Sequence, residues 1–70
     1  MEILANRIYE LREQYNMLQE ELACILCVDR STIAKYECNL REPDLKTLIH
    51  IADVFDVSVD YLLGRTNLTK

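Results

Sequence analysis

The sequence predicts an all-α fold of five short helices packed into one compact domain. Apolar residues recur every three to four positions along nearly the whole chain, which is the spacing of helices that bury one face. One glycine, Gly64, and one proline, Pro43, leave few positions for the tight turns of β-hairpins. With 70 residues the chain is long enough for one domain only, and a domain of this size is marginally stable on its own.

The first helix is expected at residues 2–14 and the second at residues 19–26. Asn16 can end the first helix, because asparagine tolerates the left-handed backbone conformation that is common at helix C-termini. Leu18 precedes the second helix and has no side-chain oxygen, so the first amides of that helix need an acceptor from elsewhere. The inner stripe of the first helix should contain Leu4, Ile8, Leu11 and Tyr15.

The third helix is expected at residues 30–37, with the carboxylate of Asp29 as its N-terminal cap. Cys27 lies in the tight turn before it. Asn39 can end the third helix in the same left-handed conformation as Asn16. Two short helices joined by a tight turn are therefore predicted.

These two helices should pack against the core on one side only. Arg30, Ser31 and Lys35 fall on the opposite, exposed face of the third helix. A buried back and a polar front of this kind are typical of a helix-turn-helix, here at about residues 19–38. The apolar residues expected on the buried side are Leu22, Ala23, Leu26, Val28 and Ile33.

Two further helices and a short tail complete the predicted fold. Asp44 should cap a fourth helix at residues 45–55, and Ser58 a fifth helix at residues 59–63 that ends before the only glycine. Residues 66–70 are expected to form a short C-terminal tail. The inner stripe of the fourth helix should contain Leu45, Leu48, Ile51, Ala52 and Phe55.

Six ordered motifs give the chain a family resemblance. They are RIxxLR at 7–12, QEELA at 19–23, RSTIAKYE at 30–37, REP at 41–43, LKTLxxIA at 45–52 and VSVDYLLG at 57–64. From about Asn6 to Arg65 the chain resembles the lambda-repressor-like helix-turn-helix family, also called the Xre or Cro type. The resemblance implies a DNA-binding domain at residues 1–65 and a sequence-specific transcriptional regulator.

The resemblance also implies which side chains meet the bases of double-stranded DNA. A recognition helix contacts base edges near its N-terminal end, which enters the major groove. Arg30, Ser31 and Lys35 occupy that face of the third helix. Arginine can donate two hydrogen bonds to guanine O6 and N7, so we expect a guanine in the half-site.

Phosphate contacts are expected from residues that flank the same face. Gln19 matches a family glutamine that contacts the DNA backbone and braces the recognition helix, and it begins a helix whose free amides favour an anion. Asn39 and Arg41 match positions that hold another phosphate, and Thr32 completes the expected set. Contacts of this kind position a protein without reading the sequence.

Arg12 and Glu37 match a pair that forms a partly buried ion bridge between the first and third helices in related repressors. We therefore interpret both residues as structural. Tyr36, beside Glu37, should pack its ring into the core with the hydroxyl at the edge.

The three cysteines are candidates for a metal or redox site. Cys24 and Cys27 form a CxxC motif, and Cys38 and His50 follow it. Cys27 matches a position where the family often has the turn glycine, which implies a positive φ that strains any residue with a Cβ. Because His50 falls inside the fourth helix and a second ligand pair is missing, we expect reduced thiols, no metal and no cofactor. A thiol or zinc sensor is a weaker alternative. No nucleophile is placed with a base and an orienting acid, so no enzyme activity is expected.

The formal net charge of −4 opposes binding to phosphates. The excess acid lies in residues 42–60, which hold five carboxylates and only Lys46, while the rest of the chain is neutral overall. In the resembled architecture this region lies behind the helix-turn-helix. We therefore expect a modest affinity for double-stranded DNA that depends strongly on salt.

The sequence leaves two function classes open. The first is a repressor that binds a palindromic operator as a homodimer, since one helix reads too few base pairs. Its dimer contacts are expected from Ile49, Val54 and Tyr61. The second is a protein-interaction module, such as an antitoxin or anti-repressor, that uses the acidic surface. No membrane span, secretory leader or small-molecule site is evident, so a cytoplasmic location is expected.

Overall fold

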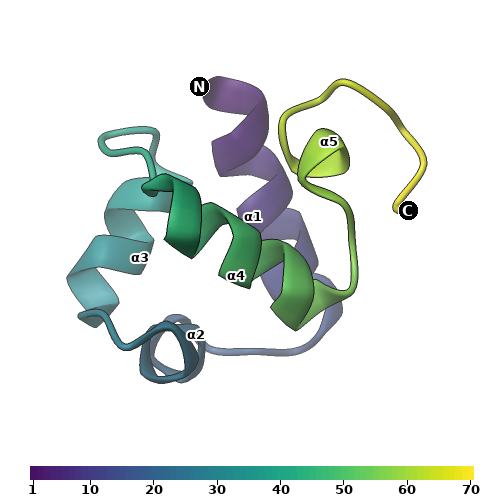
Figure 1. Ribbon diagram of the computed structural model, residues 1–70. Coiled ribbons are helices and arrows are strands. Elements are labelled where there is room, and N and C mark those ends of the chain that lie inside the picture. The colour runs from purple at the N-terminus through teal and green to yellow at the C-terminus, as the bar shows by residue number, and fades with distance from the viewer.

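The computed structural model describes all 70 residues and contains five α-helices and no strand, as predicted. Figure 1 shows α2 and α3 on one side of the molecule and α5 with the C-terminal segment on the other. None of the helices combines the length and the apolar character that a membrane crossing needs. The bounds are α1 Glu2–Gln14, α2 Gln19–Leu26, α3 Arg30–Glu37, α4 Leu45–Phe55 and α5 Val59–Leu62.

A single hydrophobic core draws on all five helices. Each helix supplies at least one side chain that is almost completely buried, and each such burial contributes roughly 1.5–3 kcal/mol. No helix can bury its apolar stripe without the others, so the helices depend on one another for stability. The largest of these side chains are Ile8, Leu22, Ile33, Ile51, Phe55 and Leu62.

Two expected core residues lie at the edge of the core. Leu45 is 71% exposed, so its assignment to the buried stripe is wrong. It is the first residue of α4, and the side chains that bury this helix begin one turn later, at Leu48. Tyr15 is half exposed, but its ring packs edge-on against Phe55 with centroids 5.1 Å apart. Its hydroxyl donates to the Phe55 carbonyl at 2.9 Å, which explains why the ring stays at the surface.

The predicted caps of α4 and α5 are present, and that of α3 is not. Asp44 accepts a hydrogen bond from the Thr47 amide at 2.9 Å, and this bond lowers the pKa of the Asp44 carboxyl. Ser58 caps α5 in the same way through the Tyr61 amide. Asp29 has the extended backbone of a cap, but its side chain accepts no such bond. The prediction of a carboxylate cap is therefore wrong: the Thr32 and Ile33 amides donate to the backbone carbonyl of Asp29 and not to its side chain.

The start of α2 is capped without a hydroxyl. Glu21 reaches back, and its Oε1 accepts a hydrogen bond from the Leu18 amide at 2.7 Å. This is one half of a capping box, the half that needs a glutamate three residues after the cap. The leucine at the cap position is therefore compatible with a well-formed first turn of α2.

Four residues other than glycine have a positive φ, and each lies where a helix ends. Asn16, Cys27 and Asn39, at φ 52°, 59° and 60°, adopt the conformation that the sequence predicted for them. Asp56, at φ 55°, ends α4 and was not anticipated. Asparagine and aspartate tolerate this region better than cysteine does, so the turn of the helix-turn-helix carries the least favourable residue of the four.

The C-terminal residues fold back against α5 and α1. Arg7 donates to the carbonyls of Tyr61 at 2.6 Å and Thr66 at 2.9 Å, and to Asn67 Oδ1 at 2.9 Å. Its guanidinium also lies 4.0 Å from the centre of the Tyr61 ring. Tyr61 and Val54 pack against the core as partly buried residues. Val54 and Tyr61, which we expected to be free of the core and available for dimer contacts, therefore belong partly to the core.

Replacing Cys27 with glycine should stabilise the domain by about 0.5–1 kcal/mol. Relief of the left-handed conformation is worth about 1–2 kcal/mol, and the extra freedom of glycine in the unfolded chain offsets about 0.4–1 kcal/mol of it. The measurement is urea unfolding followed by circular dichroism. Cys38→Gly is the matched control and should not stabilise, because Cys38 has φ −92°. A Cys27→Gly variant no more stable than wild type would contradict the expected strain.

Candidate nucleic-acid interface

The turn between α2 and α3 brings the two helices together across the core. The Cys27 amide donates to the Cys24 carbonyl at 3.2 Å and the Val28 amide to the Ala23 carbonyl at 3.0 Å, which closes the end of α2. Asp29 is extended and starts α3 at once. The buried side matches the prediction, with Leu22, Ala23, Leu26 and Ile33 in the core and Val28 partly buried against it.

The outward face of α3 is polar. Arg30, Ser31 and Lys35, the residues predicted to contact bases, are all exposed. None of the three forms a salt bridge with a carboxylate, whereas Arg12, Arg65 and Lys70 all do. The face is therefore exposed, and no carboxylate forms a salt bridge with any of its three polar side chains.

The residues predicted to contact phosphates surround this face. Gln19 begins α2 and is half-buried, and Thr32 is half-buried on α3. Asn39 and Arg41 are exposed in the loop after α3, where Asn39 Oδ1 accepts a hydrogen bond from the Met1 ammonium at 2.7 Å. A shallow hollow lies at the start of α2, lined by Leu18, Gln19, Glu20 and Arg30.

A buried ion pair joins α1 to α3 behind this surface. Arg12 Nε lies 2.6 Å from Glu37 Oε2, and Arg12 Nη2 lies 3.1 Å from Glu37 Oε1. The two side chains are only 8% and 5% exposed. The hydrogen bond to Glu37 raises the pKa of Arg12, although burial acts in the opposite direction. Arg12 also donates to the Met17 carbonyl at 2.6 Å and so holds the loop before α2.

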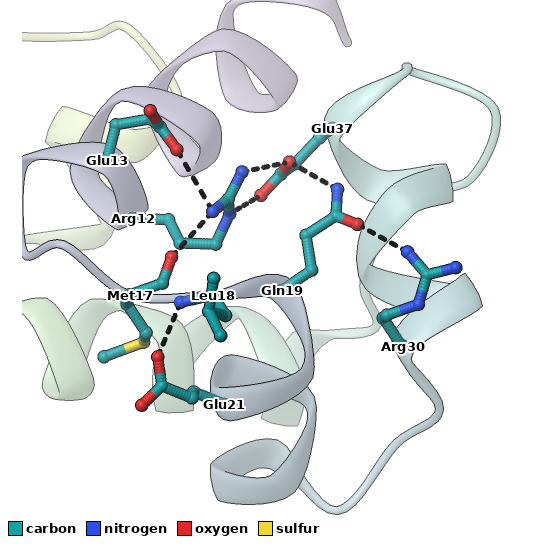
Figure 2. A network of polar contacts seen from close by, with 8 residues as sticks. All are labelled: Arg12, Glu13, Met17, Leu18, Gln19, Glu21, Arg30 and Glu37. Atoms are coloured by element: carbon teal, nitrogen blue, oxygen red, sulfur yellow. Dashed lines mark hydrogen bonds and ion pairs between the residues drawn. The ribbon is translucent and has the colours of Figure 1, made fainter.

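The ion pair continues into a chain of hydrogen bonds that ends at the surface (Figure 2). Gln19 Nε2 donates to Glu37 Oε1 at 3.0 Å, and Gln19 Oε1 accepts from Arg30 Nη1 at 3.0 Å. Three helices contribute to this chain. The resemblance implied that Gln19 braces the recognition helix but not which residues it contacts, because no local pattern signals a contact between residues 11 and 18 positions apart.

Tyr36 and the cysteines occupy different environments. Tyr36 is buried as predicted, and this burial raises the pKa of its phenol. Cys24, Cys27 and Cys38 are free and exposed. No group of three or more histidine, cysteine, aspartate or glutamate side chains is arranged to hold a metal ion.

Together, a short helix, a tight turn and a second helix with a polar outer face define a helix-turn-helix domain. The family model described as "Helix-turn-helix" matches residues 8–62. The chain belongs to this family, and its five-helix fold is of the lambda-repressor-like type.

Several proteins similar to this chain are named helix-turn-helix transcriptional regulators. The transcriptional regulator ImmR of Bacillus subtilis is 34% identical over 67 residues, which cover 96% of this chain and 53% of ImmR. An uncharacterised helix-turn-helix transcriptional regulator of Archaeoglobus fulgidus is 40% identical over 57 residues, covering 81% of this chain and 80% of that protein. The chain spans about half the length of most of the Bacillus relatives it matches.

A solved structure has the same fold. The P22 c2 repressor, crystallised in complex with a synthetic operator, superposes with a TM-score of 0.80. The similarity covers 84% of this chain and 89% of the repressor chain, at 25% sequence identity.

Replacing Arg12 with methionine should destabilise the domain by about 3–5 kcal/mol, because Glu37 would remain buried without its partner. Urea unfolding measures the loss. The double variant Arg12→Met with Glu37→Leu should recover most of the stability, since it leaves no unpaired charge. The control Arg65→Met, at an exposed salt bridge, should change stability by less than about 0.5 kcal/mol. Equal effects of Arg12→Met and Arg65→Met would contradict a structural role for the buried pair.

Proposed function

We propose that this domain binds double-stranded DNA at specific sequences and regulates transcription, acting as a repressor. The observation that carries the proposal is the outward face of α3, where Arg30 and Lys35 are exposed and free of acidic partners. The names of the relatives, and the operator bound to the P22 c2 repressor, support it. Binding rather than catalysis is the proposed activity, and the cytoplasm is the proposed location.

The first turn of α3 would enter the major groove. Arg30 uses one of its five N–H groups on Gln19, so enough donors remain for a bidentate contact with guanine O6 and N7. Lys35 and Ser31 lie on the same exposed face and would contact neighbouring bases. We propose that Gln19, Thr32, Asn39 and Arg41 bind the phosphates on either side, which would fix the depth and angle of α3.

The charge distribution suits DNA binding of moderate strength. The acidic excess lies in residues 42–60, on α4 and α5 and the turns around them, and not on the outward face of α3. Phosphates near α3 would meet Arg30, Lys35 and Arg41, although Glu42 and Asp44 lie in the same loop as Arg41 and would reduce its contribution. Because phosphate contacts release counterions, the affinity should fall steeply as salt rises.

We further propose that the domain binds a palindromic operator as a homodimer. One recognition helix reads too few base pairs for specificity in a genome, whereas two helices about one helical turn apart read a two-fold site. Ile49 on α4 is 46% exposed and is the residue of the expected dimer set that is most open to a partner. Val54 and Tyr61 are partly occupied by the core and would contribute less.

A protein-interaction module on the same fold is the second candidate. The five carboxylates of residues 42–60 form an acidic region that has only Lys46 to balance it. Such a surface would suit a basic protein partner, as in an antitoxin or anti-repressor. This candidate requires negligible affinity for duplex DNA even at low salt.

Arg30→Ala and Lys35→Ala should each weaken binding to a specific duplex. The duplex is first obtained by selecting bound sequences from a random pool with the wild-type domain. Loss of a bidentate contact costs about 1–3 kcal/mol, so Arg30→Ala should bind at least fivefold more weakly in fluorescence anisotropy. Arg65→Ala is the control and should bind as wild type does. Wild-type affinity in both α3 variants would remove the outward face of α3 from the interface.

Light scattering on the protein with its selected duplex should report two protein copies for each duplex. Ile49→Asp should reduce the second binding event, because a buried charge opposes an apolar contact between copies. Ile25→Asp is a matched control, since Ile25 is 43% exposed on α2 and lies outside the expected dimer set. One copy on every selected duplex would contradict the homodimer.

A further inference from the structure

One side of α4 carries apolar and charged side chains next to each other. Leu45, Lys46, Ile49 and Asp53 are all exposed, and the pitch of an α-helix places them within an arc of about 100°. Leu45 and Ile49 are 71% and 46% exposed, and they are neighbours because they lie one turn apart. In Figure 1 α4 runs across the front of the molecule with no other helix over it. These four residues, the α4 face, are therefore uncovered in a single copy.

Neither charge of the α4 face is paired within the domain. No salt bridge includes Lys46 or Asp53. The two residues lie about two turns apart on the helix, which is too far for them to pair with each other. Hydrogen bonds from Thr47 lower the pKa of the Asp44 carboxyl, and Lys46 adds to this effect from a distance without forming an ion pair. One copy therefore presents a cation and an anion that both lack a partner.

A second copy of α4 can supply both partners. A two-fold contact joins a patch to an identical patch, so every unlike pair of residues occurs twice. Lys46 and Asp53 lie on the same side of Ile49 around the helix, one turn before it and one turn after it. When two α4 helices pack antiparallel at Ile49, Lys46 of each copy lies opposite Asp53 of the other. The α4 face is therefore complementary to itself, which favours a second copy over an unrelated partner.

We infer that two copies of the domain pair through antiparallel α4 helices, with Ile49 against Ile49 at the two-fold axis and Lys46 against Asp53 on both sides of it. This inference rests on the homodimer proposed above and names its contact face. Leu45, next to Ile49, extends the apolar contact, which accounts for an exposed leucine at the start of α4.

The size of the contact predicts when it forms. One pair of short helices buries less than the roughly 800 Å² per partner of a standard interface. The free domain should therefore be mostly monomeric. Two half-sites on one duplex raise the local concentration of the second copy, so the contact should appear as cooperative binding to DNA.

The first test uses charge reversal on the selected duplex. Lys46→Asp and Asp53→Lys each turn both ion pairs into like-charge pairs, and each should lower the cooperativity of the two binding events at least about fivefold in fluorescence anisotropy. An equal mixture of the two variants makes both pairs attractive again and should restore the cooperativity. The double variant should restore it too. Arg65→Asp and Glu10→Lys make the same charge changes at exposed residues away from α4, and they should leave the cooperativity unchanged.

The second test needs no DNA. Sedimentation of the free domain at high protein concentration and low salt should show partial dimers for wild type and for the mixture of Lys46→Asp with Asp53→Lys. Each variant alone should sediment as a monomer. Low salt is used because exposed ion pairs are screened at high ionic strength.

The outcomes separate this inference from the proposed function. Wild-type cooperativity in both single variants would overturn the α4 pairing, and so would a mixture that binds no more cooperatively than either variant alone. Neither result would affect DNA binding by α3, which the Arg30→Ala and Lys35→Ala variants test. If the wild-type domain prefers no duplex over any other, the proposed function fails. The sedimentation of the mixture then decides whether α4 pairs with itself.

Discussion

The buried ion pair between Arg12 and Glu37 is the interaction on which the outward face of α3 depends. Its charges satisfy each other with two hydrogen bonds inside a domain that has little room for other polar groups. The same pair holds the loop before α2 through the Met17 carbonyl and the start of α2 through Gln19. One interaction therefore links α1, α2 and α3 directly behind the face on which α3 presents its polar side chains.

Charge and apolar surface are separated in this small domain. Every helix contributes to one core, which stabilises the fold, while the acidic excess lies in the region of α4 and α5. The exposed positive charges of Arg30, Lys35 and Arg41 lie on and just after α3. A protein with a net charge of −4 can in this way offer a local surface suited to phosphates, because the average charge says little about one face.

The ends of the helices show how far local rules extend. Asn16, Cys27 and Asn39 were predictable as positive-φ positions, since asparagine tolerates this conformation and the cysteine matches the turn glycine of the resembled family. The positive φ of Asp56 was not predicted, because nothing nearby in the sequence distinguishes this residue from an ordinary surface aspartate. The cap expected from Asp29 is missing, whereas Glu21 supplies a cap that Leu18 cannot. The residue types near a helix start limit which side chains can cap it. The conformation that each side chain adopts then decides which of them forms the hydrogen bond.

The sequence by itself determined the number of helices, their bounds to within one residue, most of the buried stripe and the family, because periodicity, caps and motif spacing are local properties of the chain. The tertiary structure decided the burial and the hydrogen bonds of side chains whose partners are distant in the sequence. Leu45 lies outside the core because it is the first residue of α4, one turn before the first side chain that this helix buries. Tyr15 stays at the edge of the core, where its hydroxyl donates to the Phe55 carbonyl. The bonds of Gln19 to Glu37 and Arg30 belong to this second group, since they exist only once three helices have packed.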